Sequence, residues 1–497
     1  MLADLFRSFL ARKSPSIALP ESGDELILRG TAALAEGRTA EAAELLARAV
    51  DAGRRGVEVF NNLGIAQRTL GHYRDALLSF EAAIDLDAGS AQPYNNRGTV
   101  QQALGQLDEA LESFERAIAL DSASAQAHFN RANVLGELSR FGEAVQGYDR
   151  AVALSPGYAE AFHNRGNALD SLRRYDEAIA SYERAIALRP GHADAHLNKA
   201  LSLLVQGDFS RGWASYEWRW KSALLEGARR TFAQPLWLGR ESLRGRTILL
   251  HAEQGLGDTL QFCRYVPFVA ALGAAVLLEV QPVLKDLLRG LGGADRVLAR
   301  NEPLPPFETH CPLLSLPLAF GTTAESIPAN VPYIAADSAR VEAWRGALGE
   351  RTAPRIGLAW TATHRSEYGR RRSIALPEFL RLLPGHVQGI SLHKDLAEGE
   401  LALLRERGIP HFGAGFADTA ALVESMDLVI SVDTSIAHLA GAMGKPVWIL
   451  IPHKGDWRWM EGTDQSPWYP TARLFRQPEP GDWDSVIHEV RAALQAA

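Results

Sequence analysis

Two short segments in the second half of the chain combine residue types that transfer protons and bind anions. The first covers residues 251–261 and reads HAEQGLGDTLQ. Its glycines, Gly255 and Gly257, let a ligand approach the backbone, and the helix N-terminus predicted after them suits an anion. An acid at this place can also simply cap the helix. Three side chains of the segment can accept a proton from a hydroxyl group: His251, Glu253 and Asp258.

The second segment covers residues 433–441, reads DTSIAHLAG and directly follows an apolar run. The hydroxyl groups of Thr434 and Ser435 lie at a predicted helix N-terminus, where free amides and the helix dipole can hold a diphosphate. His438, on the first turn, can reach the same phosphates. Helix capping by Thr434 is the alternative interpretation.

A third, cationic set consists of the run 370–373, which includes Arg372 and Ser373, and of Lys394. Preorganised donors of this kind stabilise the negative charge of a leaving nucleotide without a metal. A solvated charge run is the alternative, but convergence at three strand ends favours binding. The predicted nucleotide-binding residues are Gly255, Gly257, Arg372, Ser373, Lys394, Asp433, Thr434, Ser435 and His438.

Short apolar runs that alternate with helical segments place these residues at the ends of strands. Such alternation is typical of parallel sheets with helices on both faces, and ligands of these folds bind beyond the carboxyl ends of the strands. Two sets of strands predict two Rossmann-like halves facing a cleft, residues 246–335 and residues 336–497, the second of which contains seven of the nine predicted nucleotide-binding residues. The predicted strands are 247–251, 275–280, 355–360, 387–392, 427–432 and 446–451.

The first half of the chain repeats with a period of 34 residues. Each clear unit has a small residue at its eighth position and an aromatic one at its twenty-fourth, which is typical of tetratricopeptide repeats. Such units stack into a right-handed superhelix with a concave groove. We therefore predict a segment at 1–22 that is a cap or loose, a solenoid of about six repeats at 23–226 and a linker at 227–245. The aromatic run at 213–220 is predicted to pack against the next domain.

Asparagine recurs at the sixth position of five consecutive repeats. A carboxamide both donates and accepts, so a row of them along the groove can bind the amides of an extended peptide. The alternatives are that each asparagine bridges neighbouring helices or is tolerated in solvent. We favour peptide binding because the recurrence needs a reason, and we expect a protein partner in the groove. The five residues are Asn62, Asn96, Asn130, Asn164 and Asn198.

Composition narrows the class of protein. The chain has 497 residues, 46% hydrophobic and 22% charged, as in ordinary globular proteins, and its net charge of -7 argues against nucleic acid as a partner. Cys263 and Cys311 make neither a disulfide framework nor a metal site. The longest apolar stretch, 266–280, is shorter than the ~20 residues of a membrane span, and the N-terminus lacks a signal-peptide pattern. We expect a cytoplasmic protein.

The repeats together with HAEQGLGDTLQF and DTSIAH resemble bacterial tetratricopeptide-repeat glycosyltransferases. The catalytic half of those enzymes is similar to the heptosyltransferase-like GT-B family. The two-part architecture also resembles O-GlcNAc transferase and the flagellin glycosyltransferases. The resemblance covers roughly residues 23–490.

The resemblance implies an inverting transfer from a nucleotide-sugar donor, usually without a metal. It implies Asp258 as the base if the heptosyltransferase-like enzymes are followed, and His251 if O-GlcNAc transferase is followed. It assigns donor binding to the segment from Asp433 to His438. The donor stays open among ADP-heptose, UDP-GlcNAc and a CMP-linked nonulosonic acid, and no other cofactor is expected.

We therefore expect a glycosyltransferase that modifies Ser or Thr hydroxyls of a protein recruited by the repeats, for example a flagellin. Two alternatives stay open. One is a repeat scaffold whose second half is catalytically inactive and only binds a partner or a nucleotide. The other is an enzyme that acts on polysaccharide or lipid-linked acceptors.

Overall fold

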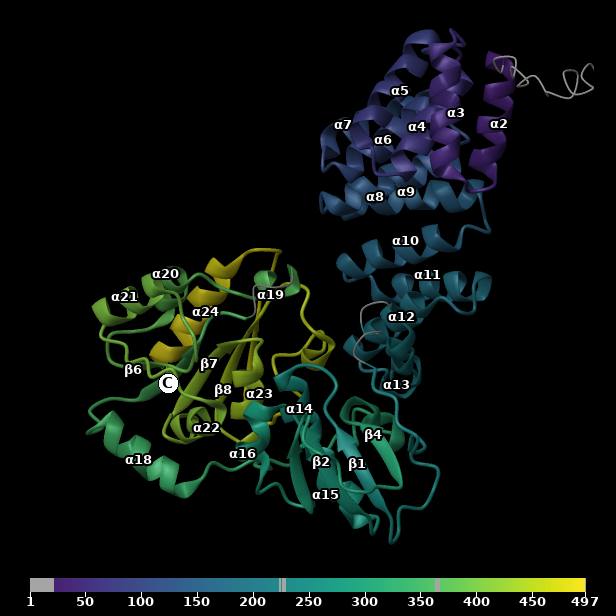
Figure 1. Ribbon diagram of the computed structural model, residues 1–497. Helices are drawn as coiled ribbons and strands as arrows, with labels where there is room; N and C mark the ends of the chain where they lie inside the picture. Colours follow the sequence, from purple (N-terminus) through teal and green to yellow (C-terminus); the bar gives the residue numbers. More distant parts are fainter. Residues whose placement is uncertain (1–21, 223–224, 226–228, 363–366, 497) are drawn as a thin grey trace, which may run out of the picture. The chain divides into compact units, whose positions relative to one another are not determined.

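The structure, a computed structural model, describes residues 22–222, 225, 229–362 and 367–496. The chain divides into two compact units, Met1–Arg174 and Tyr175–Ala497 (Figure 1). The predicted segment 1–22, apart from its last residue, lies outside the described residues, as do the predicted solenoid end at 226 and the first two residues of the predicted linker.

The first unit consists of antiparallel helix pairs that follow the 34-residue period. Gly64 and Gly98 show why the eighth position is small: a Cβ atom there would lie 2.6 Å from the Phe80 ring and 2.8 Å from the Phe114 ring. These aromatic side chains are fully buried between the two helices of their repeats. The helices are α2 (Gly23–Ala35), α3 (Thr39–Asp51), α4 (Val57–Thr69), α5 (Tyr73–Leu86), α6 (Ala91–Ala103), α7 (Leu107–Leu120), α8 (Ala125–Glu137), α9 (Phe141–Leu154) and α10 (Ala159–Ser171).

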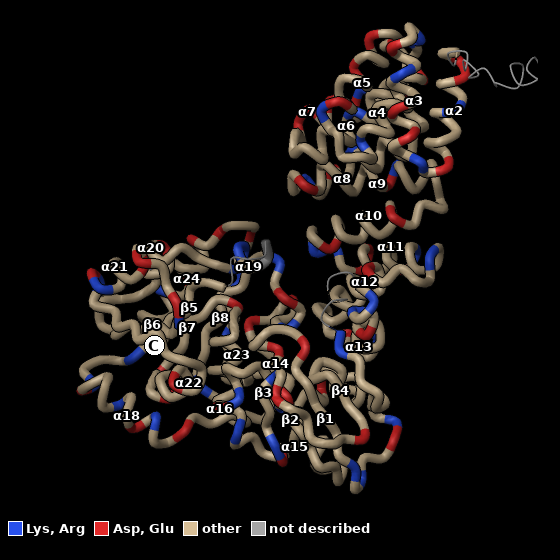
Figure 2. Tube along the Cα trace, in the orientation of Figure 1, with Lys and Arg blue, Asp and Glu red and all other residues tan. Residues whose placement is uncertain are grey.

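Charged residues also join neighbouring helices of this unit. Acidic and basic residues are interspersed along its helices (Figure 2). Arg131 on α8 pairs with Glu115 on α7 at 2.8 Å, and Arg165 on α10 pairs with Asp149 on α9 at 2.6 Å. These pairs are partly exposed, so each contributes about 0–1 kcal/mol, and burial of the apolar faces carries most of the stability.

The second unit begins inside the fifth repeat, earlier in the chain than the domain boundary that the repeat pattern predicts. Its first helices are α11 (Tyr175–Leu188), α12 (Ala193–Val205) and α13 (Phe209–Tyr216), followed by the short 3-10 helix η1 (Glu217–Lys221). Trp213 is buried and its ring meets those of Trp457 and Trp468 edge-on, at centroid distances of 5.3 and 6.5 Å. The aromatic run therefore packs against the α/β part as predicted, and this burial moves the last repeat into the second unit.

The rest of the second unit is an α/β part that is built on two parallel sheets. The first sheet has the order β3-β2-β1-β4 and the second the order β6-β5-β7-β8-β9. All six predicted strands are present, and β3, β4 and β9 are additional. The strands are β1 (Thr247–His251), β2 (Ala275–Val280), β3 (Arg296–Ala299), β4 (Thr309–Pro312), β5 (Arg355–Ala359), β6 (Gln388–Ser391), β7 (Leu428–Val432), β8 (Val447–Ile451) and β9 (Ala472–Arg476).

Helices cover both faces of the second sheet, because alternate residues of each strand point to opposite faces. One face, with Ile356 and Ile430, packs against α20, α21 and α24; the other, with Val429 and Ile449, packs against α22 and α23. Helices of this part are α18 (Ser338–Leu348), α19 (Glu367–Arg371), α20 (Leu376–Phe379), α21 (Glu398–Glu406), α22 (Phe416–Glu424), α23 (Ser435–Ala442) and α24 (Trp483–Ala496).

The first sheet is covered differently on its two faces. Ile248 and Leu250 pack with Leu260 of α14 and Val266 of α15, whereas Leu249 packs with residues that lie outside helices. These residues of the second face are Phe232, Leu304 and Phe307. The prediction of helices on both faces is therefore wrong for this sheet among the described residues. Its helices are α14 (Leu256–Phe262), α15 (Val266–Ala271), α16 (Lys285–Leu288) and α17 (Leu316–Ala319).

Within the described ranges, no helix has both the length and the apolar character needed to cross a membrane.

Candidate functional site

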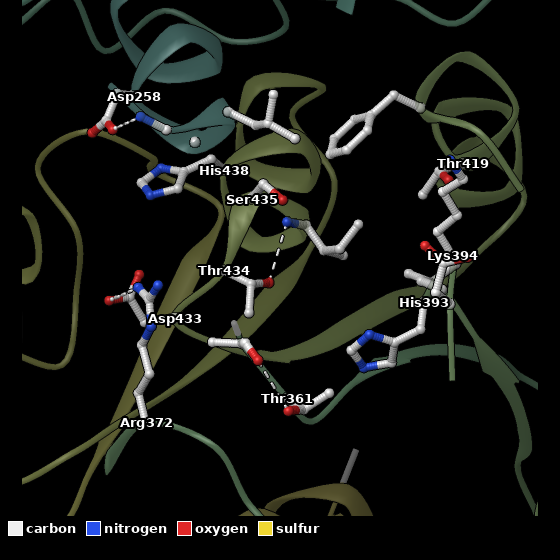
Figure 3. A pocket seen from close by; sticks show the side chains of 18 of the residues that line it. Asp258, Thr361, Arg372, His393, Lys394, Thr419, Asp433, Thr434, Ser435 and His438 are labelled. Carbon is white, nitrogen blue, oxygen red and sulfur yellow. Dashed lines mark hydrogen bonds and ion pairs between the residues drawn. The ribbon is translucent and has the colours of Figure 1, made fainter. Parts of the chain in front are cut away.

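A cavity of about 820 Å³ lies in the second unit at the carboxyl ends of strands from both sheets. Figure 3 shows Asp258 and His438 on one side of it and His393 and Lys394 on the other. Ligands of parallel sheets bind at this end of the strands. The strand-end residues that line the cavity are Gln254–Asp258 after β1, Thr361 after β5, His393 and Lys394 after β6, Asp433–Ser435 after β7, and Asp456 and Arg458 after β8.

The N-terminus of α23 points into this cavity. Thr434 is the N-cap: its backbone is extended, and its Oγ1 accepts a hydrogen bond from the Ile436 N–H at 3.2 Å. The Ser435 hydroxyl lines the cavity and forms no hydrogen bond with the described residues. The first amides of a helix carry the positive end of its dipole. Both the capping and the anion-binding interpretations of this segment therefore agree with its geometry.

His438 is a neutral group of the cavity wall. Its Nδ1 lies 2.9 Å from the Tyr469 hydroxyl, and burial lowers its pKa to about 3. A Cβ atom at Gly257 would lie 2.6 Å from the imidazole, so only glycine lets α14 approach α23 this closely. His438 can therefore exchange a hydrogen bond with a ligand but supplies no positive charge near neutral pH.

The three predicted residues of the cationic set have different surroundings. Lys394 is exposed, lines the cavity and has no ion pair or hydrogen bond with the part of the chain that the structure describes. Arg372 also lines the cavity, but its Nη1 lies 3.1 Å from the buried Asp433 carboxylate. Ser373 is not in the lining: its hydroxyl accepts from the Ala362 N–H at 2.9 Å and donates to the Gly369 carbonyl. Ser373 thus connects the lining residue Ala362 to α19.

His393 also lines the cavity, although it was not among the predicted residues. Its Nε2 accepts a hydrogen bond from the Trp360 N–H at 3.0 Å, so the ring proton is on Nδ1. Burial lowers the pKa of His393 to about 4, and the ring is therefore neutral. Thr361, Asp456 and Arg458 also line the cavity without having been predicted.

Asp258 is the only one of the three candidate bases among the lining residues. Its Oδ2 accepts a hydrogen bond from the Gly255 N–H at 2.7 Å, and its Oδ1 is paired with Arg458. The side chain retains 16% exposure, which leaves it reachable from the cavity. Asp258 thus caps α14 and faces the cavity at once.

His251 and Glu253 point elsewhere. His251 lies on the same face of β1 as Leu249, where its Nε2 is 3.2 Å from His310 Nδ1 and its ring packs near Phe232; burial lowers its pKa to about 3. Glu253 is buried against Arg219, with 2.9 Å between Oε1 and Nη2. Burial raises the pKa of Glu253 to about 7, although the arginine opposes this shift. We correct the prediction that the three candidates cluster at the cleft.

The asparagine row also differs from its prediction. Asn96 and Asn130 are buried, and their amide groups donate to Asn61 at 2.8 Å and to Asn95 at 3.0 Å on the preceding repeat. Asn62 and Asn164 make equivalent bonds to Thr31 and Asn133, at 3.5 and 2.9 Å. Asn198 lies on α12 of the second unit. For these four asparagines the contacts support the bridging alternative, because one amide N–H of each is used between repeats.

Replacing Asn96 with Ala should lower the free energy of unfolding by about 1–3 kcal/mol, since the buried Asn61 carboxamide oxygen loses its donor. Urea titration of the full chain measures this. Asn62→Ala is the matched control: its bond of 3.5 Å is long and more exposed, so its effect should be smaller. A stable Asn96→Ala protein that no longer captures its protein partner would restore the peptide-binding interpretation.

Within the described ranges, no group of three or more His, Cys, Asp or Glu side chains is arranged to hold a metal ion.

Comparison with known proteins supports the assignment of the N-terminal helices to tetratricopeptide repeats. The tetratricopeptide repeat family matches residues 5–92, 95–159 and 159–192. Protein FlbA of Caulobacter vibrioides is 29% identical over 324 residues, which cover 59% of this chain and 53% of that protein. The matched region thus spans about half of the relative's length. The N-terminal part of the chain is a tetratricopeptide-repeat solenoid.

Solved repeat proteins align with about a third of the chain. MamA is 23% identical over 34% of this chain and 98% of its own, with a TM-score of 0.31. TTC0263, a thermophilic repeat protein of Thermus thermophilus, is 24% identical over 37% of this chain and 100% of its own, with a TM-score of 0.32. YrrB, described as a repeat protein with an unusual peptide-binding site, is 20% identical over 38% and 94%, with a TM-score of 0.30.

Proposed function

We propose that the second unit is a GT-B-type glycosyltransferase whose cavity binds a nucleotide-sugar donor. One observation carries this proposal: a helix N-terminus, a lysine unpaired among the described residues and a partly exposed carboxylate meet in one cavity at the ends of two parallel sheets. The cavity volume of about 820 Å³ is within the range of volumes found for sites that bind small molecules and cofactors. The protein would act in the cytoplasm on ADP-heptose, UDP-GlcNAc or a CMP-linked nonulosonic acid.

The donor phosphates would lie against the N-terminus of α23. The Ser435 hydroxyl and the first amides of the helix donate hydrogen bonds there, and the Lys394 ammonium supplies the charge. The neutral His393 lines the same cavity and carries its ring proton on Nδ1. Leu396 and Phe416 make the lining beyond Lys394 more apolar, which suits a nucleobase.

In the proposed reaction the acceptor hydroxyl oxygen attacks the anomeric carbon of the donor sugar. The new C–O bond forms as the bond from that carbon to the phosphate oxygen breaks, and the configuration inverts. The hydroxyl proton passes to Asp258, and the leaving nucleotide takes both electrons of the broken bond. Lys394 and the α23 N-terminus stabilise the charge that develops on the phosphate.

The acceptor would be a Ser or Thr hydroxyl of a protein, for example a flagellin, that the repeat solenoid recruits. Support comes from the repeat fold and from the resemblance noted in the sequence. Tethering an acceptor raises its effective concentration at the cavity, so the solenoid need not touch the reacting hydroxyl. The contacts of Asn96 and Asn130 mean that surfaces other than the asparagine row would bind it.

A second candidate is a nucleotide-binding scaffold without catalysis. The observation in its favour is that three acids at or beside the cavity each have an arginine partner: Arg458 for Asp258, Arg219 for Glu253 and Arg372 for Asp433. A transferase assay separates the two candidates. Incubation with a bound donor and an acceptor protein should release nucleotide and add the sugar mass to the acceptor. Binding without either product supports the scaffold, and sugar on a glycan or lipid supports the polysaccharide alternative.

Replacing Lys394 with Ala should weaken nucleotide-sugar binding about 10–100-fold, because a hydrogen bond to a charged group contributes about 1.5–3 kcal/mol. Calorimetric titration of both proteins measures this. Lys285→Ala is the matched control, since this lysine pairs with Glu302 at 2.6 Å and does not line the cavity. Equal affinities of Lys394→Ala and wild type would remove the lysine from the donor site.

A further inference from the structure

Arg458 joins the two walls of the cavity. It lies in the 3-10 helix η7 (Trp457–Trp459), which follows β8 of the second sheet, and it pairs with Asp258 on α14, which follows β1 of the first sheet. Arg458 is 7% exposed and also lines the cavity. The ion pair therefore links the strand ends of two different sheets beside the donor site.

The guanidinium of Arg458 is fixed in place from several sides. Asp456 Oδ1 accepts from its Nη1 at 2.7 Å and from its backbone N–H at 3.0 Å. Its Cζ lies 4.4 Å from the centre of the Trp457 ring, which in turn packs edge-on against Trp213 of the last repeat. Because the Asp456 carboxylate and the Trp457 ring both restrain the guanidinium, Arg458 can pair with Asp258 in only one orientation.

Asp258 is restrained in the same way. Its Oδ2 is held by the Gly255 N–H, so its Oδ1 turns to Arg458. Burial raises the pKa of Asp258, Arg458 lowers it, and Asp456 and Asp433 raise it. The groups facing Asp258 from the surrounding elements are Arg458 and Asp456 near η7, Asp433 and His438 near α23, Tyr216 of α13 and Glu253 of its own loop.

We infer that Arg458 is a positioning residue that holds Asp258 ionised and aimed into the cavity. The carboxylate of Asp456, which also pairs with Arg458, weakens the effect of Arg458 on Asp258. The inference rests on the proposed function, in which Asp258 takes the acceptor proton. Arg458 keeps its own protons throughout, so the only proton transferred is the one from the acceptor hydroxyl to Asp258. The acid limb of the pH–rate profile then reports the ionisation of Asp258.

Two substitutions should move this limb in opposite directions. Arg458→Met removes the charge that lowers the pKa of Asp258, so transfer should fail at a pH about 1–3 units higher than in wild type. Asp456→Asn removes a charge that raises this pKa, so the limb should move to lower pH. Arg458→Lys keeps the positive charge, so the acid limb should stay near the wild-type pH. The kcat should be lower, because an ammonium group cannot reproduce the fixed planar donors of the guanidinium. Arg405→Met is the control, because the Arg405 side chain on α21 is exposed and pairs only with Glu398 among the described residues.

Failure of the inference and failure of the proposed function can be told apart by the titration of the Asp258 carboxyl itself. Carbon-13 NMR of aspartate-labelled full-length protein follows it, with the resonance assigned by its loss in Asp258→Asn. Opposite shifts of this pKa in Arg458→Met and Asp456→Asn support the inference even in a protein without transferase activity. Unchanged titration in Asp456→Asn, or shifts of the same sign, would overturn it, also where Arg458→Met does not fold.

Discussion

Asp258→Asn should lower the rate of sugar transfer by about 10²–10⁴-fold and leave the affinity for the nucleotide-sugar donor unchanged. General base catalysis contributes a factor of this size. The asparagine keeps the shape of the side chain and can still accept the Gly255 N–H, but it cannot take a proton from the acceptor. The kcat at saturating donor and the donor dissociation constant, measured on the same preparation, test the two halves of this prediction.

The matched control for this prediction is His251→Asn. His251 was an equally good candidate base in the sequence, but it contacts His310 and Phe232 outside the cavity lining. We expect its transfer rate at saturating donor to stay within the range of other stable variants. A large loss of kcat in His251→Asn together with wild-type transfer by Asp258→Asn would show that the base has been assigned to the wrong residue.

Arg219→Met should lower the free energy of unfolding by about 3–5 kcal/mol, because it leaves the buried Glu253 carboxylate and the partly buried Glu217 carboxylate without their partner. Arg219 is fully buried in η1 at the end of the last repeat. It pairs with Glu253 beside the cavity loop at 2.9 Å and with Glu217 at 2.6 Å, and it donates to Ser315 at 2.7 Å. The last repeat and the first sheet should therefore unfold together.

Urea titration of the full chain measures this effect, and Arg211→Met on the preceding helix is the comparison. The Arg211 side chain is 57% exposed and its pairs with Glu183 and Asp208 are on the surface, so its loss should cost about 0–1 kcal/mol. If both substitutions cost the same, the interaction between the last repeat and the first sheet does not contribute to stability as the contacts of Arg219 indicate.

The helix pairs and six of the nine described strands could be predicted because they depend on patterns within the sequence. The 34-residue period locates helix pairs through residues such as Gly64 and Phe80, which meet inside one repeat. Strands such as β7, buried along almost their whole length, appear as apolar runs. The strand-end rule brought Asp258, Lys394 and Ser435 to one cavity, and applied to every strand it would have added Thr361 and His393.

What could not be predicted depends on contacts between distant segments. His251 and Asp258 are only seven positions apart in the sequence. His251, however, is the last residue of β1, and the pleat of the strand points its side chain to the face of the sheet that carries Leu249, away from the cavity lining. The pairing of Asp258 with Arg458 joins residues 200 positions apart. The asparagine row shows the same difficulty, since a recurrent polar residue such as Asn96 indicates a repeated contact but does not say whether its partner is a ligand or the next repeat.

The most direct test of the donor site is a thermal-shift measurement of the purified protein with UDP-, CMP-, ADP- and GDP-linked sugars. A ligand at 100 times its dissociation constant stabilises the folded state by about 2.7 kcal/mol, so one nucleotide class should raise the unfolding midpoint. The rise should shrink in Lys394→Ala and persist in Asp258→Asn. Unchanged midpoints with every donor in a folded protein would contradict the assignment of the cavity to a nucleotide sugar.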